Sequence, residues 1–182
     1  MNKALFLDRD GVINIDNCYV STKKDFQFQE GIFDFVNYFS KKSYLIIVIT
    51  NQSGIGRGLY SNKDFLLLSK WMINEFKERN IFITDIKYCP YHPSKGKGKY
   101  LRDSIFRKPN PGMILEASEE HNIDLKQSIF VGDRLTDMQA GLSAGVGKNF
   151  LYKSKEKIAQ KSQAYVKVEF FKEIISFLED EL

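Results

Sequence analysis

ALFLDRDGVIN, residues 4–14, joins a short apolar run to two aspartates and a glycine. The apolar run predicts a buried strand, and residues i and i+2 of an extended chain face the same side, so Asp8 and Asp10 can converge at its end. Two carboxylates at such a short distance repel each other unless a cation lies between them or one of them is protonated. One can then attack a phosphorus atom while the other moves a proton. Gly11 allows the chain to turn sharply directly after them.

The same D-x-D-G pattern also occurs in calcium-binding loops. A calcium loop needs further oxygen ligands at regular spacing and a glutamate at its twelfth position. Counted from Asp8, that position holds Tyr19. Since the pattern also follows an apolar run that predicts a buried strand, we favour a reactive pair of carboxylates over a calcium loop or a plain Asp-rich turn.

Strands and helices alternate along the rest of the chain. Apolar spacing predicts a helix from about Glu30 to Lys41, and Tyr44–Thr50 is continuously apolar, as in a central parallel strand. A Gly-rich turn is expected at 51–58, and Ser61 with Asp64 indicates a capping box. The further expected strands are 83–89, 128–133, 148–152 and 164–168, and the further helices are 110–121, 136–145 and 170–182. This alternation predicts an α/β protein with a doubly wound parallel sheet, in which ligands bind at the carboxyl ends of the strands.

Three more groups of polar residues follow predicted strands or adjoin them. The hydroxyl of Thr50 and the backbone N–H groups near Asn51 and Gln52 could hold a phosphoryl group. Lys108 offers a compact charge for a transferring phosphoryl group, and Arg107 can fork onto a second phosphate or a pair of hydroxyls.

A metal site is indicated where the strand 128–133 ends. Asp133, together with Asp8 and the backbone carbonyl of Asp10, would complete an oxygen site for Mg²⁺. Asp137 follows four residues later and can support the site through hydrogen bonds, or serve only as a helix cap.

The composition favours a small-molecule enzyme over a nucleic-acid or membrane protein. The 27 Lys and Arg exceed the 23 Asp and Glu by four, and the excess is spread along the chain. Cys18 and Cys89 make no disulfide framework, which suits a reducing compartment, and the apolar runs are too short for a signal peptide or a membrane span. We expect one domain over residues 1–182 in a cytoplasmic monomer.

In this order, the D-x-D-G, T-N, K-P and G-D-x-x-x-D motifs resemble the haloacid dehalogenase-like (HAD) superfamily of phosphohydrolases. More narrowly, five segments resemble the D-glycero-D-manno-heptose 1,7-bisphosphate phosphatases and their relatives, the histidinol-phosphate phosphatases: DRDGVIN, TNQSGIGRG, CPYHP, RKPNPGM and VGDRLTDMQAG. The resemblance implies a compact Rossmann-like domain without a large cap. It also implies Mg²⁺-dependent removal of a phosphate from a sugar phosphate that is a precursor of cell-surface polysaccharides.

The resemblance assigns a role to each matching residue. Asp8 would be the nucleophile that forms an aspartyl-phosphate, and Asp10 the general acid and then the base. Thr50 and Lys108 would stabilise the transferring group, and Mg²⁺ would be bound by Asp8, Asp10 and Asp133. The substrate would be held by Asp16, Asn17, Cys18, Tyr19, Thr50, Asn51, Gln52, Ser53, Arg107, Lys108 and Arg134. Cys18 stands where a small residue such as glycine is more usual.

The loop of about residues 89–107 departs from the family. There the family binds a structural Zn²⁺ through C-x-H and C-x-C, and of the four ligands this chain keeps Cys89 alone. The other three positions hold Tyr91, Ser104 and Phe106, and His92 falls one position late. We therefore expect no structural zinc, with Phe106 packed into the space. The basic residues Lys95, Lys97, Lys99 and Arg102 either meet the distal phosphate of a bisphosphate or only keep the loop solvated.

Two other functions stay open at this level. The chain could be a histidinol-phosphate phosphatase or another small phosphomonoester hydrolase that diverged together with its loop. It could also be a non-catalytic binding protein that keeps the HAD fold, although Asp8, Asp10, Thr50, Lys108 and Asp133 are all present.

Overall fold

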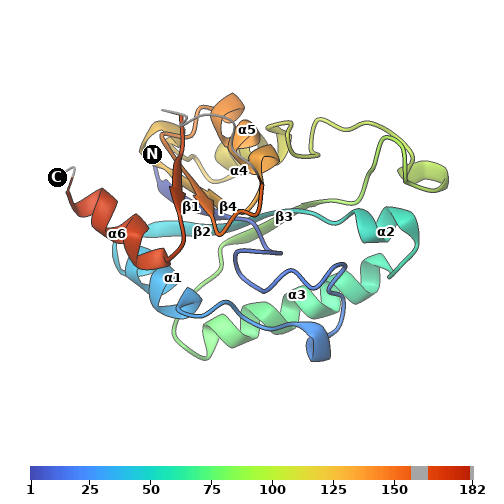
Figure 1. Ribbon diagram of the computed structural model, residues 1–182, viewed down its shortest axis with the longest axis horizontal. Helices are drawn as coiled ribbons and strands as arrows, with labels where there is room; N and C mark the ends of the chain where they lie inside the picture. Colours follow the sequence, from blue (N-terminus) through green and yellow to red (C-terminus); the bar gives the residue numbers. More distant parts are fainter. Residues whose placement is uncertain (157–163, 181–182) are drawn as a thin grey trace.

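The computed structural model describes residues 1–156 and 164–180. In this described part, six strands form one sheet in the order β3-β2-β1-β4-β5-β6, and all neighbours run in parallel (Figure 1). The strands are β1 (Lys3–Leu7), β2 (Tyr44–Asn51), β3 (Asp85–Cys89), β4 (Ile129–Gly132), β5 (Lys148–Tyr152) and β6 (Val166–Val168). The predicted α/β class with a parallel, doubly wound sheet is confirmed.

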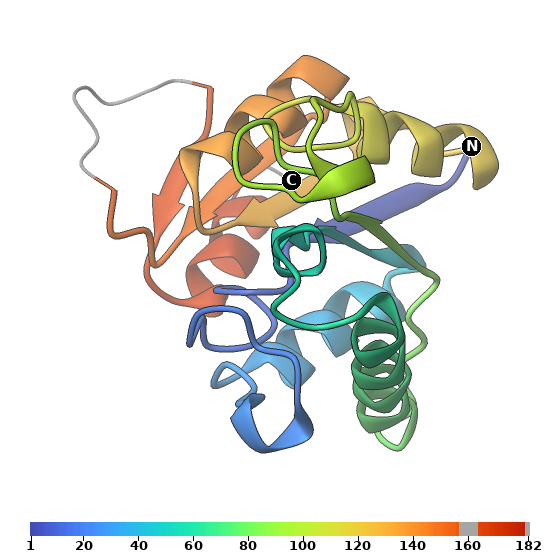
Figure 2. The same cartoon turned by 90° about the vertical axis from the view of Figure 1, so that its right-hand side faces the viewer.

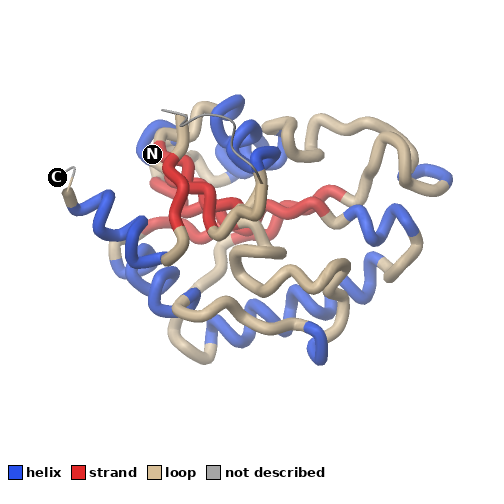
Figure 3. The backbone as a smooth tube through the Cα atoms, in the orientation of Figure 1, coloured by secondary structure: helices blue, strands red, loops and turns tan. Residues whose placement is uncertain are grey.

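Helices cover both faces of the sheet (Figure 3). One face carries α1 (Ile32–Lys41), α3 (Asn62–Lys77) and α6 (Phe171–Glu179), and the other carries α4 (Gly112–Glu120) and α5 (Leu135–Ala144). The shorter elements are α2 (Ser53–Arg57), η1 (Lys23–Asp25), η2 (Gly98–Tyr100) and η3 (Leu125–Gln127). None of the helices in the described residues has the length and apolar character needed to cross a membrane.

The apolar run of β1 is buried on both sides, and successive side chains enter different cores. Leu5 and Leu7 pack in the cluster beneath α1, α3 and α6. Ala4 and Phe6 pack in the cluster beneath α4 and α5. All four side chains are fully buried, which explains why the strand is continuously apolar instead of alternating with polar residues.

The helix boundaries follow local signals. At the start of α3, Ser61 Oγ accepts a hydrogen bond from the Asp64 N–H (3.1 Å), and Asp64 Oδ2 accepts one from the Ser61 N–H (2.8 Å), so the predicted capping box is confirmed. Helix α1 begins at Ile32 and not at Glu30, because Gly31 has a left-handed φ of 78°. The end of the predicted closing helix, residues 181–182, lies outside the described residues.

The expected Gly-rich turn at 51–58 is wrong in part, because Ser53–Arg57 form the short helix α2. Its glycines permit packing that a larger residue would block. A Cβ atom at Gly54 would lie 2.2 Å from Cε1 of Tyr60, so this position must be glycine for the tyrosine ring to lie against the helix.

The loops after β1, β2, β3 and β4 gather at one edge of the sheet, to the right in Figure 1. Figure 2 faces this edge and shows the long loop after β3 beside α2, where the Lys97 N–H donates to the Gly56 carbonyl (2.8 Å). No described residue belongs to a separate cap domain over this edge. This is the edge at which the reactive residues were predicted to meet.

Candidate active site

A cleft of about 450 Å³ opens at the carboxyl edge of the sheet. Its lining residues are Asp8, Asp10, Asp16, Cys18, Tyr19, Thr50, Asn51, Ser53, Gly54, Arg57, Tyr60, Arg107, Lys108, Arg134, Thr136, Asp137 and Glu156. Most of the residues predicted to bind the substrate are among them. The sequence did not single out Gly54, Arg57, Tyr60, Thr136 or Glu156.

Three predicted site residues and the loop lysines do not line the cleft. Asn17 borders a separate depression, Gln52 lies beneath the cleft with 1% of its surface exposed, and Asp133 stands behind Gly11. The basic loop residues that were candidates for a distal phosphate also lie outside it: Lys95, Lys97, Lys99 and Arg102.

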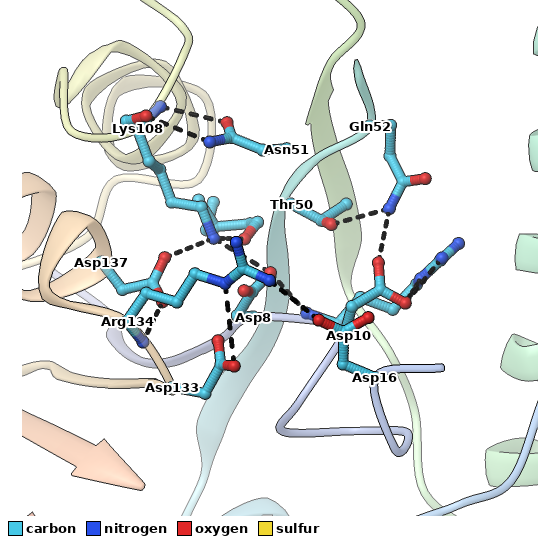
Figure 4. Close-up of polar contacts among 12 residues, drawn as sticks. Asp8, Asp10, Asp16, Thr50, Asn51, Gln52, Lys108, Asp133, Arg134 and Asp137 are labelled. Carbon is cyan, nitrogen blue, oxygen red and sulfur yellow. Dashed lines mark hydrogen bonds and ion pairs between the residues drawn. The ribbon is translucent and has the colours of Figure 1, made fainter. Parts of the chain in front are cut away.

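Five charged side chains lie together at the carboxyl edge of the sheet and are called the floor: Asp8, Asp10, Lys108 and Asp137 line the cleft, and Asp133 lies beside them (Figure 4). Three arginines border the cleft and are called the rim: Arg57, Arg107 and Arg134.

Lys108 is the buried cation of the floor (Figure 4). Its Nζ lies 2.9 Å from Asp8 Oδ1 and 2.7 Å from Asp137 Oδ1, and it donates to the Ile49 carbonyl (2.8 Å). Burial alone would lower the pKa of Lys108, but Asp137 and Asp8 outweigh burial and raise it. The ammonium group is therefore charged and held in one place by three acceptors.

Asn51 positions Lys108 from the end of β2. Its Nδ2 donates to the Lys108 carbonyl (3.0 Å), and its Oδ1 accepts from the Lys108 N–H (3.1 Å). This pair of hydrogen bonds fixes the backbone of a loop residue against a strand residue. Asn51 lines the cleft as predicted, and its side-chain oxygen and nitrogen are both engaged with Lys108.

Asp8 stands directly after β1, where its Oδ1 accepts from the Arg9 N–H (2.7 Å) and from Lys108. Burial raises the pKa of Asp8 to about 7, Lys108 opposes the rise, and Asp137 and Asp10 add to it. A carboxylate in this setting has too little positive charge around it, although Lys108 is in direct contact.

Asp133 shows the same shortage of positive charge. Burial, followed by Asp8 and Asp137, raises the pKa of Asp133 to about 8. Its Oδ1 is buried and has no hydrogen-bond partner among the described residues. Gly11 makes the close approach possible, since a Cβ atom there would lie 2.3 Å from Asp133 Oδ2.

A divalent cation fits this arrangement. Carboxylate oxygens of Asp8, Asp133 and Asp137 lie within 4.8 Å of one another, and Lys108 together with Arg134, whose Nε lies 3.9 Å from Asp133 Oδ2, does not neutralise three carboxylates. Asp137 already uses Oδ1 for Lys108 and Oδ2 for the Arg134 N–H (3.0 Å), so it both contacts the site lysine and caps helix α5. Asp8 and the unpartnered oxygen of Asp133 are the donors left for an ion, and carboxylate oxygens are what Mg²⁺ prefers.

Asp10 faces a different set of partners from the other floor carboxylates. Its Oδ1 accepts from Arg9 Nη2 (2.8 Å), Arg9 Nε (3.2 Å) and Asn14 Nδ2 (3.1 Å), and its Oδ2 accepts from Gln52 Nε2 (3.0 Å). These four hydrogen bonds fix the orientation of the Asp10 carboxylate. Arg9, with 1% of its surface exposed, was not predicted to take part. The position of Arg9 between Asp8 and Asp10, directly after a buried strand, was the sequence feature that could have indicated its contact with Asp10.

Gln52 serves the floor and does not face the cleft. Its backbone N–H donates to the Cys89 carbonyl (2.8 Å), and its Nε2 donates to Thr50 Oγ1 (2.9 Å) as well as to Asp10. Its Oε1 accepts from the Tyr60 hydroxyl (2.5 Å). The backbone N–H of Gln52, expected to hold a phosphoryl group, is thus already used within the protein.

The mouth of the cleft is formed by the loop after β1. Arg134 Nη2 lies 2.8 Å from Asp16 Oδ2, and Asp16 Oδ1 accepts from the Cys18 N–H (3.0 Å). Cys18 and Tyr19 have left-handed φ values of 60° and 55°, which cost about 1–2 kcal/mol each for residues other than glycine. The guanidinium carbon of Arg57 lies over the Tyr19 ring, 5.4 Å from the centroid of the ring.

Aromatic and cationic packing organises the loop after β3, where the sequence resemblance implied the position of a zinc site. Phe106 and Tyr91 pack against the cluster that contains Cys89, and Arg102 lies over the Tyr91 ring at 3.9 Å. His92 Nδ1 accepts from the backbone N–H groups of residues 94 and 95 (3.2 and 3.1 Å). Among the described residues, no cluster of three potential metal ligands includes Cys89 or His92.

Known proteins resemble this chain in both sequence and fold. The HAD-hydrolase-like family model matches residues 105–163. A D-glycero-alpha-D-manno-heptose-1,7-bisphosphate 7-phosphatase of Burkholderia mallei is 46% identical over 177 residues, 97% of this chain and 94% of the relative. This chain belongs to the HAD phosphatases. As a member, it is a phosphoric monoester hydrolase.

Two further comparisons support the place of this chain in the HAD phosphatase family. A D-glycero-beta-D-manno-heptose-1,7-bisphosphate 7-phosphatase of Vibrio cholerae is 42% identical over 165 residues, 91% of this chain and 89% of the relative. The crystal structure of a D,D-heptose 1,7-bisphosphate phosphatase from B. bronchiseptica, complexed with magnesium and phosphate, has a TM-score of 0.85 and 26% identity, covering 99% of both chains.

Proposed function

We propose that this HAD phosphatase hydrolyses a D-glycero-D-manno-heptose 1,7-bisphosphate at the 7-phosphate. Relatives that are 46% and 42% identical carry that name. The observation that supports the proposal is a cleft with two groups of charged side chains, the carboxylates and lysine of the floor and the arginines of the rim. Among the described residues, Arg57 and Arg107 form no ion pair with an acidic side chain, so the rim has positive charge to offer a second phosphate.

Hydrolysis proceeds in two steps at the floor. A carboxylate oxygen of Asp8 attacks phosphorus and forms an O–P bond, while the P–O bond to the sugar breaks and the sugar oxygen takes a proton from Asp10. Asp10 then takes a proton from a water molecule, whose oxygen attacks the aspartyl-phosphate and releases inorganic phosphate and free Asp8. The hydrogen bonds from Arg9 and Gln52 keep Asp10 in place through both steps.

Two side chains stabilise charge on the transferring group. Lys108 brings a buried positive charge to the attacking oxygen of Asp8. Thr50 Oγ1 accepts from Gln52, so its own hydroxyl hydrogen is available to a phosphoryl oxygen.

Mg²⁺ would be held by Asp8, Asp133 and the backbone carbonyl of Asp10. When bound, it neutralises the floor carboxylates and lowers the repulsion between them and the phosphate. We further infer a single-domain cytoplasmic monomer that binds neither nucleic acid nor membranes, with no structural zinc. The mild charge excess, the two free cysteines and the zinc-ligand positions occupied by Tyr91, Ser104 and Phe106 support this.

The direct test is phosphate release with saturating Mg²⁺ from both anomers of the heptose bisphosphate, beside histidinol phosphate and simple sugar phosphates. We expect kcat/KM for one anomer to exceed all others by about tenfold or more, and ³¹P spectra to show loss of the 7-phosphate. Activity should vanish with EDTA and in Asp8→Asn. A flat ranking, or a preference for histidinol phosphate, would contradict the substrate assignment. Equal inertness of the wild type and Asp8→Asn would indicate a non-catalytic protein.

A further inference from the structure

We infer that Arg57 binds the phosphate that is not hydrolysed, and that it thereby makes the enzyme select bisphosphates over monophosphates. This rests on the proposed function, since it concerns the second phosphate of that substrate. Arg57 lies within the family-like segment TNQSGIGRG, but the resemblance assigned it no role. Its position on α2 and its surroundings in the cleft carry the inference.

Arg57 has hydrogen-bonding capacity that the protein leaves unused. It lines the cleft from the last residue of α2, and its Nε is buried without a hydrogen-bond partner among the described residues. A buried donor left unpaired is unfavourable, so an acceptor on a bound ligand would relieve it. The Tyr19 ring, 5.4 Å from the guanidinium, supports one face of the group and leaves its N–H edges for a phosphate.

Arg57 and Arg107 form a pair of like charges at the rim. They border the same cleft, and among the described residues neither forms an ion pair with an acidic side chain. Burial lowers the pKa of Arg107, the charges of Arg57 and Arg134 add to this, and Cys89 and Asp103 oppose it. An anion between Arg57 and Arg107 would remove this repulsion.

Arg134 is less available than the other two rim arginines. Its Nη2 is already paired with Asp16 at 2.8 Å, and its side chain is 56% exposed. Arg57 and Arg107 are therefore the rim groups whose charge is not yet matched by an acid.

Arg57 lies at the opposite end of α2 from the residues that support the floor. The helix begins at Ser53, directly after the floor-supporting residues 50–52, and rises about 6 Å before it reaches Arg57. The close contact of Gly54 with Tyr60 and the hydrogen bond from Lys97 to Gly56 hold the helix in place. This rise sets the Arg57 backbone apart from residues 50–52, which favours contact with a ligand that extends beyond the phosphate being hydrolysed, as a bisphosphate does.

The test compares heptose 1,7-bisphosphate with heptose 7-phosphate, which lacks only the second phosphate. For Arg57→Gln we expect kcat/KM on the bisphosphate to fall about 30- to 100-fold, mainly through KM, because hydrogen bonds to charged groups are lost. The kcat/KM of Arg57→Gln on heptose 7-phosphate should change less than about twofold. Arg57→Lys keeps the positive charge but not the paired N–H donors of the guanidinium, so its kcat/KM on the bisphosphate should fall about 5- to 10-fold.

Arg79→Gln is the control, because Arg79 also lies over an aromatic ring, Phe33 at 4.2 Å, but outside the cleft, and we expect its ratio of kcat/KM for the two substrates to equal that of the wild type. Equal losses on both substrates in both Arg57 variants would show a structural role and overturn the inference. Unchanged kinetics would overturn it as well. A wild type that does not prefer the bisphosphate would instead overturn the proposed function, which is seen before any variant is measured.

Discussion

The floor and the rim of the cleft treat charge in opposite ways. At the floor, Lys108 contacts two carboxylates and a carbonyl, and 2% of its side chain is exposed. At the rim, Arg57 and Arg107 face the cleft without an acidic partner among the described residues, and the third arginine is 56% exposed. The floor is interlocked by protein contacts, whereas Arg57 and Arg107 of the rim keep their charge for a ligand.

This difference assigns chemistry and selection to different residues. A floor whose positions are fixed by neighbouring side chains acts on any phosphate ester that reaches it. A rim with unmatched charge affects only ligands that carry a second anion. Changes at the floor should therefore reduce kcat for every substrate, and changes at the rim should reduce kcat/KM for bisphosphates alone.

The largest effect is expected from Asp8→Asn, which removes the attacking carboxylate while keeping its size. We expect kcat to fall by at least about a thousandfold for the heptose bisphosphate and for p-nitrophenyl phosphate alike. Steady-state phosphate release on both substrates measures this. A loss confined to the heptose bisphosphate would mean that Asp8 belongs with the rim in function.

Lys108→Met should affect both catalysis and folding. We expect kcat to fall about 10²- to 10³-fold, since a preorganised charge at the attacking oxygen is lost. We also expect the free energy of unfolding to fall by about 3–5 kcal/mol, because Asp8 and Asp137 are left as buried carboxylates without a counter-charge.

Urea unfolding and kinetics of the same preparation measure the two effects of Lys108→Met. Lys63→Met, at an exposed lysine of α3, is the control and should change neither. An unchanged unfolding free energy in Lys108→Met would contradict the interlocked floor.

Tyr60→Phe sharpens the comparison, because Tyr60 lines the cleft but its hydroxyl serves the floor. Loss of the hydrogen bond to Gln52 loosens the residue that holds Asp10, so kcat should fall about three- to tenfold while KM stays within about twofold. Burial raises the pKa of Tyr60 to about 12, so the hydroxyl remains a donor over the working pH range.

The control for Tyr60→Phe is Tyr88→Phe, which loses a similar hydrogen bond, from Tyr88 to Asn62 Oδ1 (2.8 Å), away from the cleft. It should leave kcat unchanged. A raised KM with unchanged kcat in Tyr60→Phe would mean that the hydroxyl binds the substrate.

The smallest effect concerns the loop after β3. Because Tyr91, Phe106 and Arg102 pack where the family has its zinc site, a zinc-selective chelator should leave the melting temperature unchanged. Metal analysis of the purified protein provides the second measurement. About one zinc per chain, together with a lower melting temperature after chelation, would contradict a loop held by packing.

The sequence predicted the floor better than the parts that support it, for a physical reason. Asp8 and Asp10 follow a buried strand within one short segment, so strand periodicity alone brings them together. The clamp between Asn51 and Lys108 joins residues 57 positions apart, and nothing local announces it. Arg57 was missed because the glycines around it predict a turn, and the helix there depends on packing against Tyr60.

The most direct test of the account is to find where the phosphoryl group sits during turnover. The reaction would be quenched in acid with the heptose bisphosphate and, separately, with p-nitrophenyl phosphate, and the phosphorylated peptide mapped by mass spectrometry. We predict the same product from both substrates, an acyl phosphate on Asp8, because the floor acts alike on whatever phosphate reaches it. A phosphoryl group on another residue, or different sites for the two substrates, would contradict the account.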